Sequence, residues 1–437
     1  MTRQDDLGIA VIGAGLVGPV TAMYLARRFG TVTVLEQHGD PRRNAARQGR
    51  SLMVILSVRG WRVLRELGLA DRVRRFCMPL RARCGHLPGG GTHVTPYSRD
   101  GRPIWAVERE RLLHVLLDAA EATPGVRIRF RQRIHDIDLD APAVRLHDRW
   151  LPCQRIVGCD GARSVVRAAM VARGVREHVG TLRLAYQEIN LSLALDRQTM
   201  HYWPTGDALF GAFPTAARDV FAGSVFFRLD GPAPSYASAV TAGELTEQFA
   251  ATFPELTARI PDLADQLATK PIATIPLVRC DTWVWRDRVA LAGDSCHAMA
   301  PFMGHGMNCA FEDARTLVGC LDDAGDWTAG LAAYERARKA DADAIADISY
   351  EHYRTMSRLP DARNDDVTRD LTTRLTGLFP NRFVPLYERC SFTEESYASA
   401  RENDRLLHEL AHDLLRSHGA ALLTVPDSQL REYALAH

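Results

Sequence analysis

The sequence predicts an α/β protein in which a Rossmann-like nucleotide-binding domain carries an inserted antiparallel β-sheet and is followed by a helical region. Three observations lead to this fold class. The motif GAGLVG follows an apolar run at residues 7–12. Two further apolar runs, at 155–160 and 289–294, end in an aspartate beside a glycine, and residues 181–230 alternate between apolar and polar side chains. Alternation of this kind is typical of a sheet with one covered face.

Composition excludes several classes of function. The chain has 437 residues with 54 basic and 53 acidic side chains, so its net charge of +1 favours neither nucleic acid nor an anionic surface as partner. Its nine cysteines are odd in number and form no Cys-x-x-Cys pair, so we interpret them as reduced thiols of a cytoplasmic protein and expect no metal site. We find no signal peptide and no apolar stretch of the ~18 residues that a membrane anchor requires. The pattern leaves open whether the protein is a monomer or a dimer.

The first βαβ unit has the spacing of a dinucleotide site. A buried strand leads into the glycine motif, a helix follows, and a second strand ends in Glu36, 18 residues after Gly18. In this interpretation Gly13 forms the tight turn and Gly15 lets a pyrophosphate come close. Gly18 lets the helix pack on the strand, while Glu36 holds ribose hydroxyl groups.

The next segments are predicted to complete the nucleotide-binding domain. Arg50 follows the second strand and could reach back to the pyrophosphate, or could be an ordinary solvated arginine. A helix is predicted over 56–67 and another over 108–122, with Arg109 in its first turn. The strand at 155–160 ends in Asp160, a carboxylate at the carboxyl end of a strand.

The remaining segments supply the insertion and the tail. The sequence predicts strands and turns over 79–105 and helix over 244–269, and only helices beyond residue 327. We therefore expect a discontinuous nucleotide-binding domain, a β-rich substrate domain and a helical lid. The nucleotide-binding domain comprises residues 1–75, 100–180 and 275–330. The substrate domain comprises residues 76–99 and 181–274, and the lid comprises residues 331–437.

The stretch from 288 to 317 is predicted to hold the reactive part of a ligand. A short strand stops at Asp294, a loop with Pro301 and Gly306 follows, and an amphipathic helix begins. An acid at a strand end accepts hydrogen bonds from a polyol, and a helix amino terminus favours an anion. Flavin, which combines a sugar alcohol with a ring that becomes anionic on reduction, suits this arrangement. The alternative is an ordinary connection between a strand and a helix.

Three motifs in this order, GAGLVG, CDGARS and GDSCHAMAPFMGHGMNCAFEDA, resemble those of the FAD-dependent aromatic hydroxylases of the 4-hydroxybenzoate hydroxylase fold. A closer similarity, to the members that act on kynurenine, is carried by GRSLMVILSVRG, RARCGHLPGG, TPYSRDGRPIW, HYWPTGD and RFVPLYERCSF followed by SYASA. The resemblance covers nearly the whole chain.

The resemblance implies a set of site residues. It places FAD on Gly13, Gly15, Gly18, Glu36, Arg109, Asp294, Met307 and Asn308. We expect Val17, Arg50, Asp160, Pro301 and Gly306 to bind the cofactor as well. The resemblance implies that Arg83, Tyr97 and Tyr397 grip the carboxylate of an amino-acid substrate. The chain departs from the family at His352, which stands in place of a substrate-contacting asparagine, and at His305 and Met303 in the flavin loop. These departures leave open whether kynurenine itself is the substrate.

The resemblance also implies the reaction. A flavin C4a-hydroperoxide would hydroxylate an electron-rich aromatic ring, with O2 and NADPH as co-substrates and without an assigned general base. Because only one dinucleotide motif is present and FAD takes it, NADPH would dock elsewhere. The expected activity is hydroxylation of L-kynurenine or a ring-substituted kynurenine at the 3-position. Alternatives are hydroxylation of another aromatic amino acid or aromatic carboxylate, or non-catalytic binding on the same fold.

Overall fold

The computed structural model describes residues 7–43, 53–357 and 365–436. Its first layer is a six-stranded sheet in the order β18-β19-β12-β1-β2-β8, parallel apart from β18. The strands are β1 (Ile9–Ile12), β2 (Val32–Glu36), β8 (Val126–Phe130), β12 (Arg155–Gly158), β18 (Val284–Trp285) and β19 (Val289–Leu291). All four residues of β1 are buried, as expected for a parallel strand covered on both faces.

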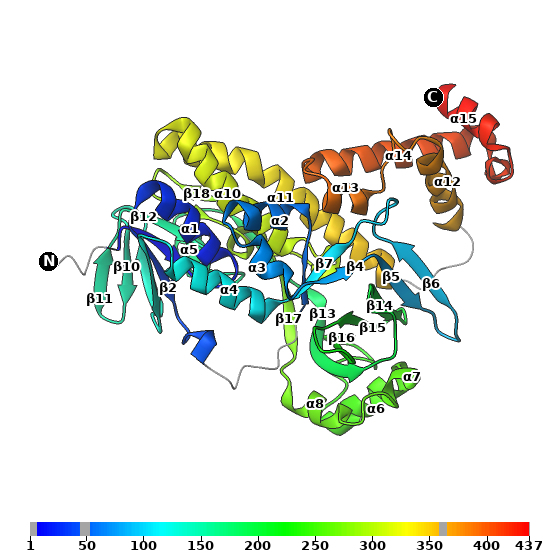
Figure 1. Cartoon of the computed structure of the whole chain (residues 1–437), viewed down its shortest axis with the longest axis horizontal. Coiled ribbons are helices and arrows are strands. Elements are labelled where there is room, and N and C mark those ends of the chain that lie inside the picture. Colours follow the sequence, from blue (N-terminus) through cyan, green and yellow to red (C-terminus); the bar gives the residue numbers. More distant parts are fainter. Residues whose placement is uncertain (1–6, 44–52, 358–364, 437) are drawn as a thin grey trace.

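Helices surround this sheet and share its hydrophobic core (Figure 1). They are α1 (Val17–Phe29), α2 (Val58–Glu66), α3 (Ala70–Arg74), α4 (Arg109–Glu121), α5 (Val165–Val171) and α10 (Gly306–Ala324). In α10 the residues Phe311, Ala314, Leu317 and Leu321 are buried, which confirms the predicted amphipathic helix. The four-residue helix α9 (Asp294–His297) interrupts what the sequence predicted as a loop, because so short a helix has no periodicity to detect.

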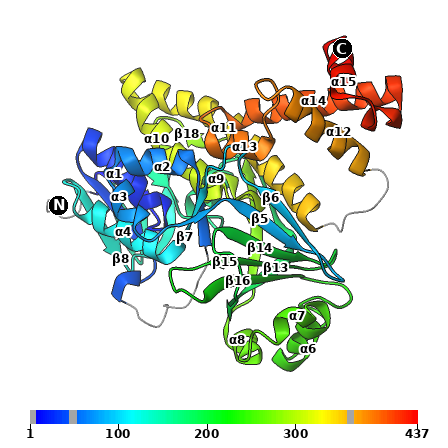
Figure 2. The same ribbon diagram turned by 45° about the vertical axis from the view of Figure 1, so that its right-hand side comes forward.

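The inserted domain is built on a seven-stranded sheet in the order β17-β13-β16-β15-β14-β5-β6 (Figure 2). Neighbouring strands are antiparallel except β14 and β5, which are parallel. The strands are β5 (Ala82–His86), β6 (Thr92–Pro96), β13 (Glu177–Ser192), β14 (Thr199–Pro204), β15 (Leu209–Pro214), β16 (Val220–Arg228) and β17 (Ala273–Cys280). Helices α6 (Ala242–Thr252), α7 (Pro254–Thr257) and α8 (Leu263–Thr269) cover one face and enclose a phenylalanine-rich core.

Two smaller sheets complete the β-structure. One, in the order β3-β7-β4, lies between the two large sheets and consists of β3 (Met53–Leu56), β4 (Met78–Leu80) and β7 (Ile104–Glu108). The other consists of β9 (Ile134–Asp138), β10 (Ala143–Leu146) and β11 (Arg149–Pro152). The mixed α/β fold with its antiparallel insertion and helical carboxyl-terminal region confirms the predicted fold class, while the boundaries between domains stay a proposal.

The carboxyl-terminal helices belong to two separate cores. They are α11 (Trp327–Ser357), α12 (Asp365–Leu378), α13 (Leu386–Phe392), α14 (Tyr397–His418) and α15 (Asp427–Ala436). At the start of α14, Tyr397 and Ala400 join the main core, which contains the six-stranded sheet. Further along the same helix, Leu407 and Leu414 pack with α12 and α15 in a core of their own. Helix α14 thus fixes a small helical lobe to the body of the protein (Figure 1).

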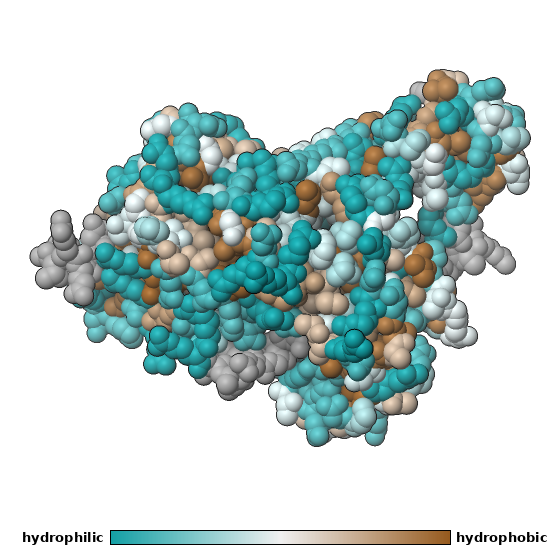
Figure 3. Space-filling view, viewed as in Figure 1, coloured by the Kyte–Doolittle hydropathy of each residue, from teal (hydrophilic) through white to brown (hydrophobic). Residues whose placement is uncertain are grey.

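The visible surface in Figure 3 is mainly hydrophilic, with hydrophobic residues in small scattered groups. Among the described residues, no helix has both the length and the apolar character needed to cross a membrane.

Candidate functional site

The three glycines of the first motif lie in three different environments. Gly13 has a φ of +97°, and an added Cβ would lie 2.6 Å from the carbonyl oxygen of Cys159. A Cβ on Gly18 would lie only 1.9 Å from the carbonyl oxygen of Gly13, so helix and strand touch there. A Cβ on Gly15 would meet no heavy atom within 4 Å. The turn and the packing contact are thus made within the protein, and the middle glycine leaves open space beside the backbone, as a bound pyrophosphate requires.

Glu36 ends β2 and is held against the glycine motif. One carboxylate oxygen accepts a hydrogen bond from the backbone N–H of Ala14 at 2.8 Å, and the other accepts from the N–H of His38 at 2.8 Å. These bonds fix the carboxylate at the carboxyl end of the strand, where a ribose would lie. Arg50, predicted to reach the same region, lies outside the described residues.

Asp294 and Arg109 come together from segments far apart in the sequence. Asp294 begins α9 and Arg109 begins α4, and both side chains are exposed. The protein atoms packed around the Asp294 carboxyl desolvate it and raise its pKa, while the charges of His297 and Arg109 lower that pKa. A carboxylate that is reached by solvent, yet surrounded by enough protein to raise its pKa, faces a recess in the molecule.

A buried ion network fixes the segment that carries Asp294. Asp313 of α10 accepts hydrogen bonds from the N–H of Gly293 at 2.9 Å, from Nε2 of His297 at 2.5 Å and from Nε of Arg338 at 2.9 Å. Burial alone would raise the pKa of Asp313, but His297 and Arg338 lower it to about 2. Sequence reasoning did not identify this network, because its members are 16 and 25 residues apart.

Asn308 ties the flavin loop to β3 and α2 through its side chain. Its Oδ1 accepts from the N–H of Ser57 at 3.0 Å, and its Nδ2 donates to the carbonyl oxygens of Ile55 at 2.8 Å and Gly304 at 3.0 Å. The amide is therefore fully used within the protein. With Gly306 and Met307 it forms the first turn of α10, whose backbone N–H groups have no acceptor within the helix.

Three other predicted cofactor residues, Asp160, Val17 and Pro301, lie in different surroundings. One carboxylate oxygen of Asp160 accepts from the N–H of Val165 at 2.7 Å at the start of α5. The other oxygen is buried, and no hydrogen-bond partner lies near it in the described part of the chain. Val17 packs beside Gly293, and the exposed Pro301 begins a 3₁₀ turn that ends in the buried Met303.

Four polar residues gather between β5, the β6–β7 connection and the tail helices. Three of them, Arg83, Tyr97 and His352, were predicted, and Tyr387 was not. The guanidinium of Arg83 lies 2.6 Å from Nε2 of His352 on α11. Tyr97 is buried, and its ring centroid lies 5.1 Å from that of Tyr387 on α13, which in turn lies 6.1 Å from the ring of His352. Tyr387 was missed, although PLY is part of a motif noted in the sequence, because a tyrosine in an apolar helix gives no chemical signal of its own.

The protonation state of His352 follows from this geometry. A guanidinium can only donate, so Nε2 of His352 is the acceptor and the ring is neutral. Burial, and then the charge of Arg83, lowers the pKa of His352 to about 3. Among the described residues, Arg83 forms no ion pair with a carboxylate, so its positive charge is left uncompensated beside two tyrosines.

Tyr397 faces the flavin loop instead of the Arg83 cluster. Its hydroxyl lies 2.9 Å from Nδ1 of His305, whose Nε2 lies 3.0 Å from Oγ of Ser391. Burial, and then the charge of Arg59, lowers the pKa of His305 to about 3. Arg59 stacks over the Tyr397 ring at 3.8 Å. His305 is thus a neutral link between the loop before α10 and the tail helices.

Comparisons with known proteins identify the family of the chain. A sequence family described as FAD binding domain matches residues 6–349. Kynurenine 3-monooxygenase of Myxococcus xanthus (strain DK1622) is 34% identical over 444 aligned residues, which cover 96% of this chain and 94% of the relative. The chain belongs to the FAD-dependent aromatic monooxygenases. Kynurenine 3-monooxygenase of Salinispora tropica (strain ATCC BAA-916 / DSM 44818 / JCM 13857 / NBRC 105044 / CNB-440) is also 34% identical, covering 97% of this chain and 96% of the relative.

Solved structures of other monooxygenases support the fold of this monooxygenase. The tetrameric form of 2-methyl-3-hydroxypyridine-5-carboxylic acid oxygenase superposes with a TM-score of 0.68 at 21% identity, covering 82% of this chain and 94% of that chain. PqsL of Pseudomonas aeruginosa in complex with 2-aminobenzoylacetate superposes with a TM-score of 0.65 at 24% identity, covering 80% and 97%. The cofactor of this monooxygenase is FAD, and NADPH is the usual co-substrate of the family.

Proposed function

We propose that this monooxygenase uses NAD(P)H and O2 to hydroxylate L-kynurenine, or a ring-substituted kynurenine, at the 3-position of its aromatic ring. The observation that carries the proposal is the uncompensated charge of Arg83. Its neighbour His352 is a neutral acceptor, so the guanidinium keeps its full attraction for a carboxylate. The names of the curated relatives support kynurenine as the bearer of that carboxylate.

The glycine motif and the recess beside Asp294 fit FAD. Gly15 would admit the pyrophosphate, Glu36 would bind the ribose, and Arg109 and Asp294 would bind the pyrophosphate and the ribityl chain. The first turn of α10 would direct its backbone N–H groups to the flavin ring, which favours the reduced anion. Bound FAD supplies the activation of dioxygen.

The side chains of the protein position the substrate and exclude water. Arg83 would bind the carboxylate, with the hydroxyls of Tyr97 and Tyr387 as further donors close by. Ile55, Leu80 and Met200 supply an apolar wall to this cluster. Water kept away from the reacting atoms cannot divert the oxygen into hydrogen peroxide. An aromatic amine activates its own ring at the ortho position, so no strong general base is required.

A second candidate substrate is another aromatic amino acid or aromatic carboxylate. His352 favours it, because a histidine stands beside Arg83 where the kynurenine-hydroxylating members resembled by this chain have an asparagine. An imidazole is larger and offers different hydrogen bonds, and both differences act at the carboxylate end of the ligand.

Substrate-stimulated NADPH oxidation by the FAD-loaded enzyme tests the proposal. The panel contains kynurenine, ring-substituted kynurenines, anthranilate and tryptophan, and mass spectrometry detects the product with one added oxygen atom. Kynurenine is expected to give hydroxylated product with the highest kcat/KM. Stimulation by anthranilate or tryptophan alone would instead establish the second candidate.

Two variants at position 83 connect the activity to the site. Arg83→Ala is expected to weaken kynurenine binding about ten- to hundredfold, because a charge-assisted hydrogen bond contributes ~1.5–3 kcal/mol. Arg83→Lys keeps the charge but loses the planar fork, so it should also weaken binding. Arg183→Ala, which removes an exposed arginine paired with Asp230, is the control. Unchanged affinity in both Arg83 variants would remove the residue from the substrate site.

A further inference from the structure

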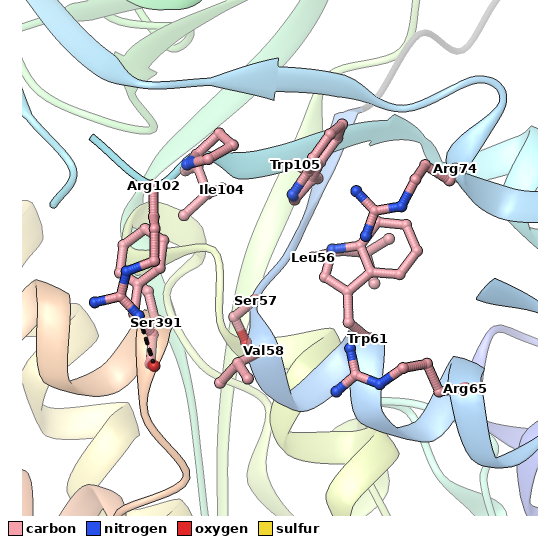
Figure 4. A pocket seen from close by; sticks show the side chains of 12 residues that line it. Leu56, Ser57, Val58, Trp61, Arg65, Arg74, Arg102, Ile104, Trp105 and Ser391 are labelled. Carbon is pink, nitrogen blue, oxygen red and sulfur yellow. Dashed lines mark hydrogen bonds between the residues drawn. The ribbon is translucent and has the colours of Figure 1, made fainter. Parts of the chain in front are cut away.

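A cavity of about 260 Å³ opens between α2, β7 and α13, apart from the substrate cluster (Figure 4). Two indole rings, Trp61 and Trp105, form part of its lining. Three arginines, Arg65, Arg74 and Arg102, surround it. In Figure 4, Arg102 lies on one side of the cavity, and Arg65 and Arg74 lie on the other. Neither the glycine motif nor the substrate cluster contributes a residue to this lining.

The cavity carries a positive charge that the protein does not neutralise. The guanidinium of Arg74 lies 4.3 Å from the ring centroid of Trp61 and 4.4 Å from that of Trp105. Among the described residues, neither Arg65 nor Arg74 forms an ion pair. Arg102 is paired with Asp100 at 2.6 Å. Two guanidinium groups therefore attract an anion to this cavity.

Two polar groups in the lining are also left without partners. The indole N–H of Trp61 and the hydroxyl of Ser57 are buried, and neither has a hydrogen-bond partner within the described part of the chain. Only 4% of Trp61 is exposed, so water does not satisfy its N–H. A buried donor without an acceptor costs about 1–3 kcal/mol. Because both atoms are closed to solvent, a ligand in the cavity would reach them only after a shift of the surrounding side chains.

The cavity lies next to the flavin loop. Ser57, in its lining, donates its backbone N–H to the side chain of Asn308. Leu56, also in the lining, directly follows Ile55, whose side chain contacts Gly304 of the loop. A ligand held in this cavity would therefore lie one strand away from the predicted position of the flavin.

We propose that this cavity binds a phosphate-bearing end of the nicotinamide dinucleotide co-substrate. The inference rests on the proposed function, which requires NAD(P)H while the single dinucleotide motif is used by FAD. Arginine forks match phosphate oxygens, and guanidinium and indole planes stack on an adenine ring. The cavity is smaller than the ~300–1,000 Å³ of sites that enclose a whole ligand, so it suits one end of a larger molecule.

Equilibrium binding to the FAD-loaded enzyme tests the cavity without turnover. Quenching of indole fluorescence and calorimetry would follow titrations with NADP⁺, NAD⁺ and 2′,5′-ADP. Arg65→Gln and Arg74→Gln are each expected to raise the dissociation constant of NADP⁺ at least tenfold. Trp61→Phe is expected to reduce the fluorescence response. Arg259→Gln, which removes an exposed arginine of the helical layer below the seven-stranded sheet, should change neither.

The three ligands distinguish the phosphate that is bound. If the cavity holds the 2′-phosphate, the arginine variants weaken NADP⁺ and 2′,5′-ADP but not NAD⁺; if it holds the pyrophosphate, they also weaken NAD⁺. Either pattern supports the proposal. Arg65→Gln removes a side chain that does not stack on either indole, so it remains informative should Arg74→Gln disturb folding. NADP⁺ affinity unchanged in Arg65→Gln, or reduced equally by Arg259→Gln, overturns the proposal.

A separate measurement keeps this inference distinct from the proposed function. FAD reduced chemically with dithionite and then mixed with substrate and O2 needs no nicotinamide. If kynurenine is hydroxylated under these conditions and the variants bind NADP⁺ unaltered, the cavity is not the nicotinamide nucleotide site, but kynurenine remains the substrate. If kynurenine is not hydroxylated but the arginine variants weaken NADP⁺ binding, kynurenine is not the substrate, and the cavity remains the nucleotide site.

Discussion

The hydroxyl of Tyr397 lies 2.9 Å from Nδ1 of His305, which joins the first turn of α14 to the residue that precedes α10. The two residues are 92 positions apart, and both are buried. Arg59 reinforces the link, because it stacks on Tyr397 and donates two hydrogen bonds to Glu312 of α10 at 2.8 Å. The tail helices are therefore connected to the flavin loop through a small number of identifiable contacts.

Tyr397→Phe should uncouple NADPH consumption from hydroxylation. The substitution keeps the ring under Arg59 but leaves Nδ1 of His305 without its partner, at a cost of about 1–3 kcal/mol. A looser loop should admit water, so more hydrogen peroxide is expected per NADPH consumed, with FAD content unchanged. Tyr433→Phe on α15, whose hydroxyl accepts from Gln429, is the matched control. A peroxide yield equal to that of the wild type would show that this link does not affect the reacting site.

His305→Gln should make the free energy of unfolding less sensitive to a decrease in pH. The folded protein holds the pKa of His305 at about 3, whereas the unfolded chain titrates near 6.5. Between these values only the unfolded state binds the proton, so the free energy of unfolding falls as pH decreases, by up to ~1.4 kcal/mol per pH unit. Glutamine cannot titrate. Chemical denaturation from pH 6.5 to 4.5 should therefore show a loss about 2 to 3 kcal/mol smaller in the variant. Identical losses in the two proteins would contradict the burial of a neutral His305.

Gly15→Ala should lower FAD affinity without destabilising the fold. An added Cβ meets no protein atom within 4 Å, so the apoprotein can accommodate it, but it enters the space proposed for the pyrophosphate. At least tenfold weaker FAD binding, or ~1.4 kcal/mol, is expected from titration of the apoprotein with FAD. Gly319→Ala, at an exposed and uncrowded position of α10, should leave FAD affinity unaltered and slightly raise stability. Normal FAD affinity in Gly15→Ala would separate the glycine motif from the cofactor.

His352→Glu should compete with the substrate for Arg83. A glutamate beside the guanidinium would neutralise the charge that we assign to carboxylate recognition, so kynurenine affinity should fall about ten- to hundredfold. His352→Asn keeps the position neutral and should retain most of the affinity. Perturbation of the flavin absorbance spectrum on substrate addition measures both dissociation constants. Equal affinities in the two variants would indicate that the carboxylate binds elsewhere.

Local patterns predicted the elements of this fold well, because strands such as β1 and helices such as α10 show their burial directly in the sequence. They also predicted the positions of Glu36 at a strand end and of Arg109 at a helix start, while the roles of these residues stay predictions. Contacts between distant side chains could not be predicted. The 2.6 Å contact of Arg83 with His352 spans 269 residues, and no periodicity connects them. The unpaired charge of Arg74 likewise depends on which acidic groups lie nearby in three dimensions.

The fixed carboxylate of Glu36 has a consequence for how two adenine nucleotides are kept apart. An anion anchored by two backbone N–H groups cannot turn away, so it repels a nucleotide that carries a phosphate on its adenosine ribose. FAD has free hydroxyl groups at that place, and NADPH does not. If Glu36 holds the adenosine ribose as proposed, NADPH would therefore be repelled from the motif that binds FAD. In the proposed arrangement, an acidic strand end and an arginine-lined cavity would discriminate between the two ligands by the presence or absence of a phosphate on the adenosine ribose.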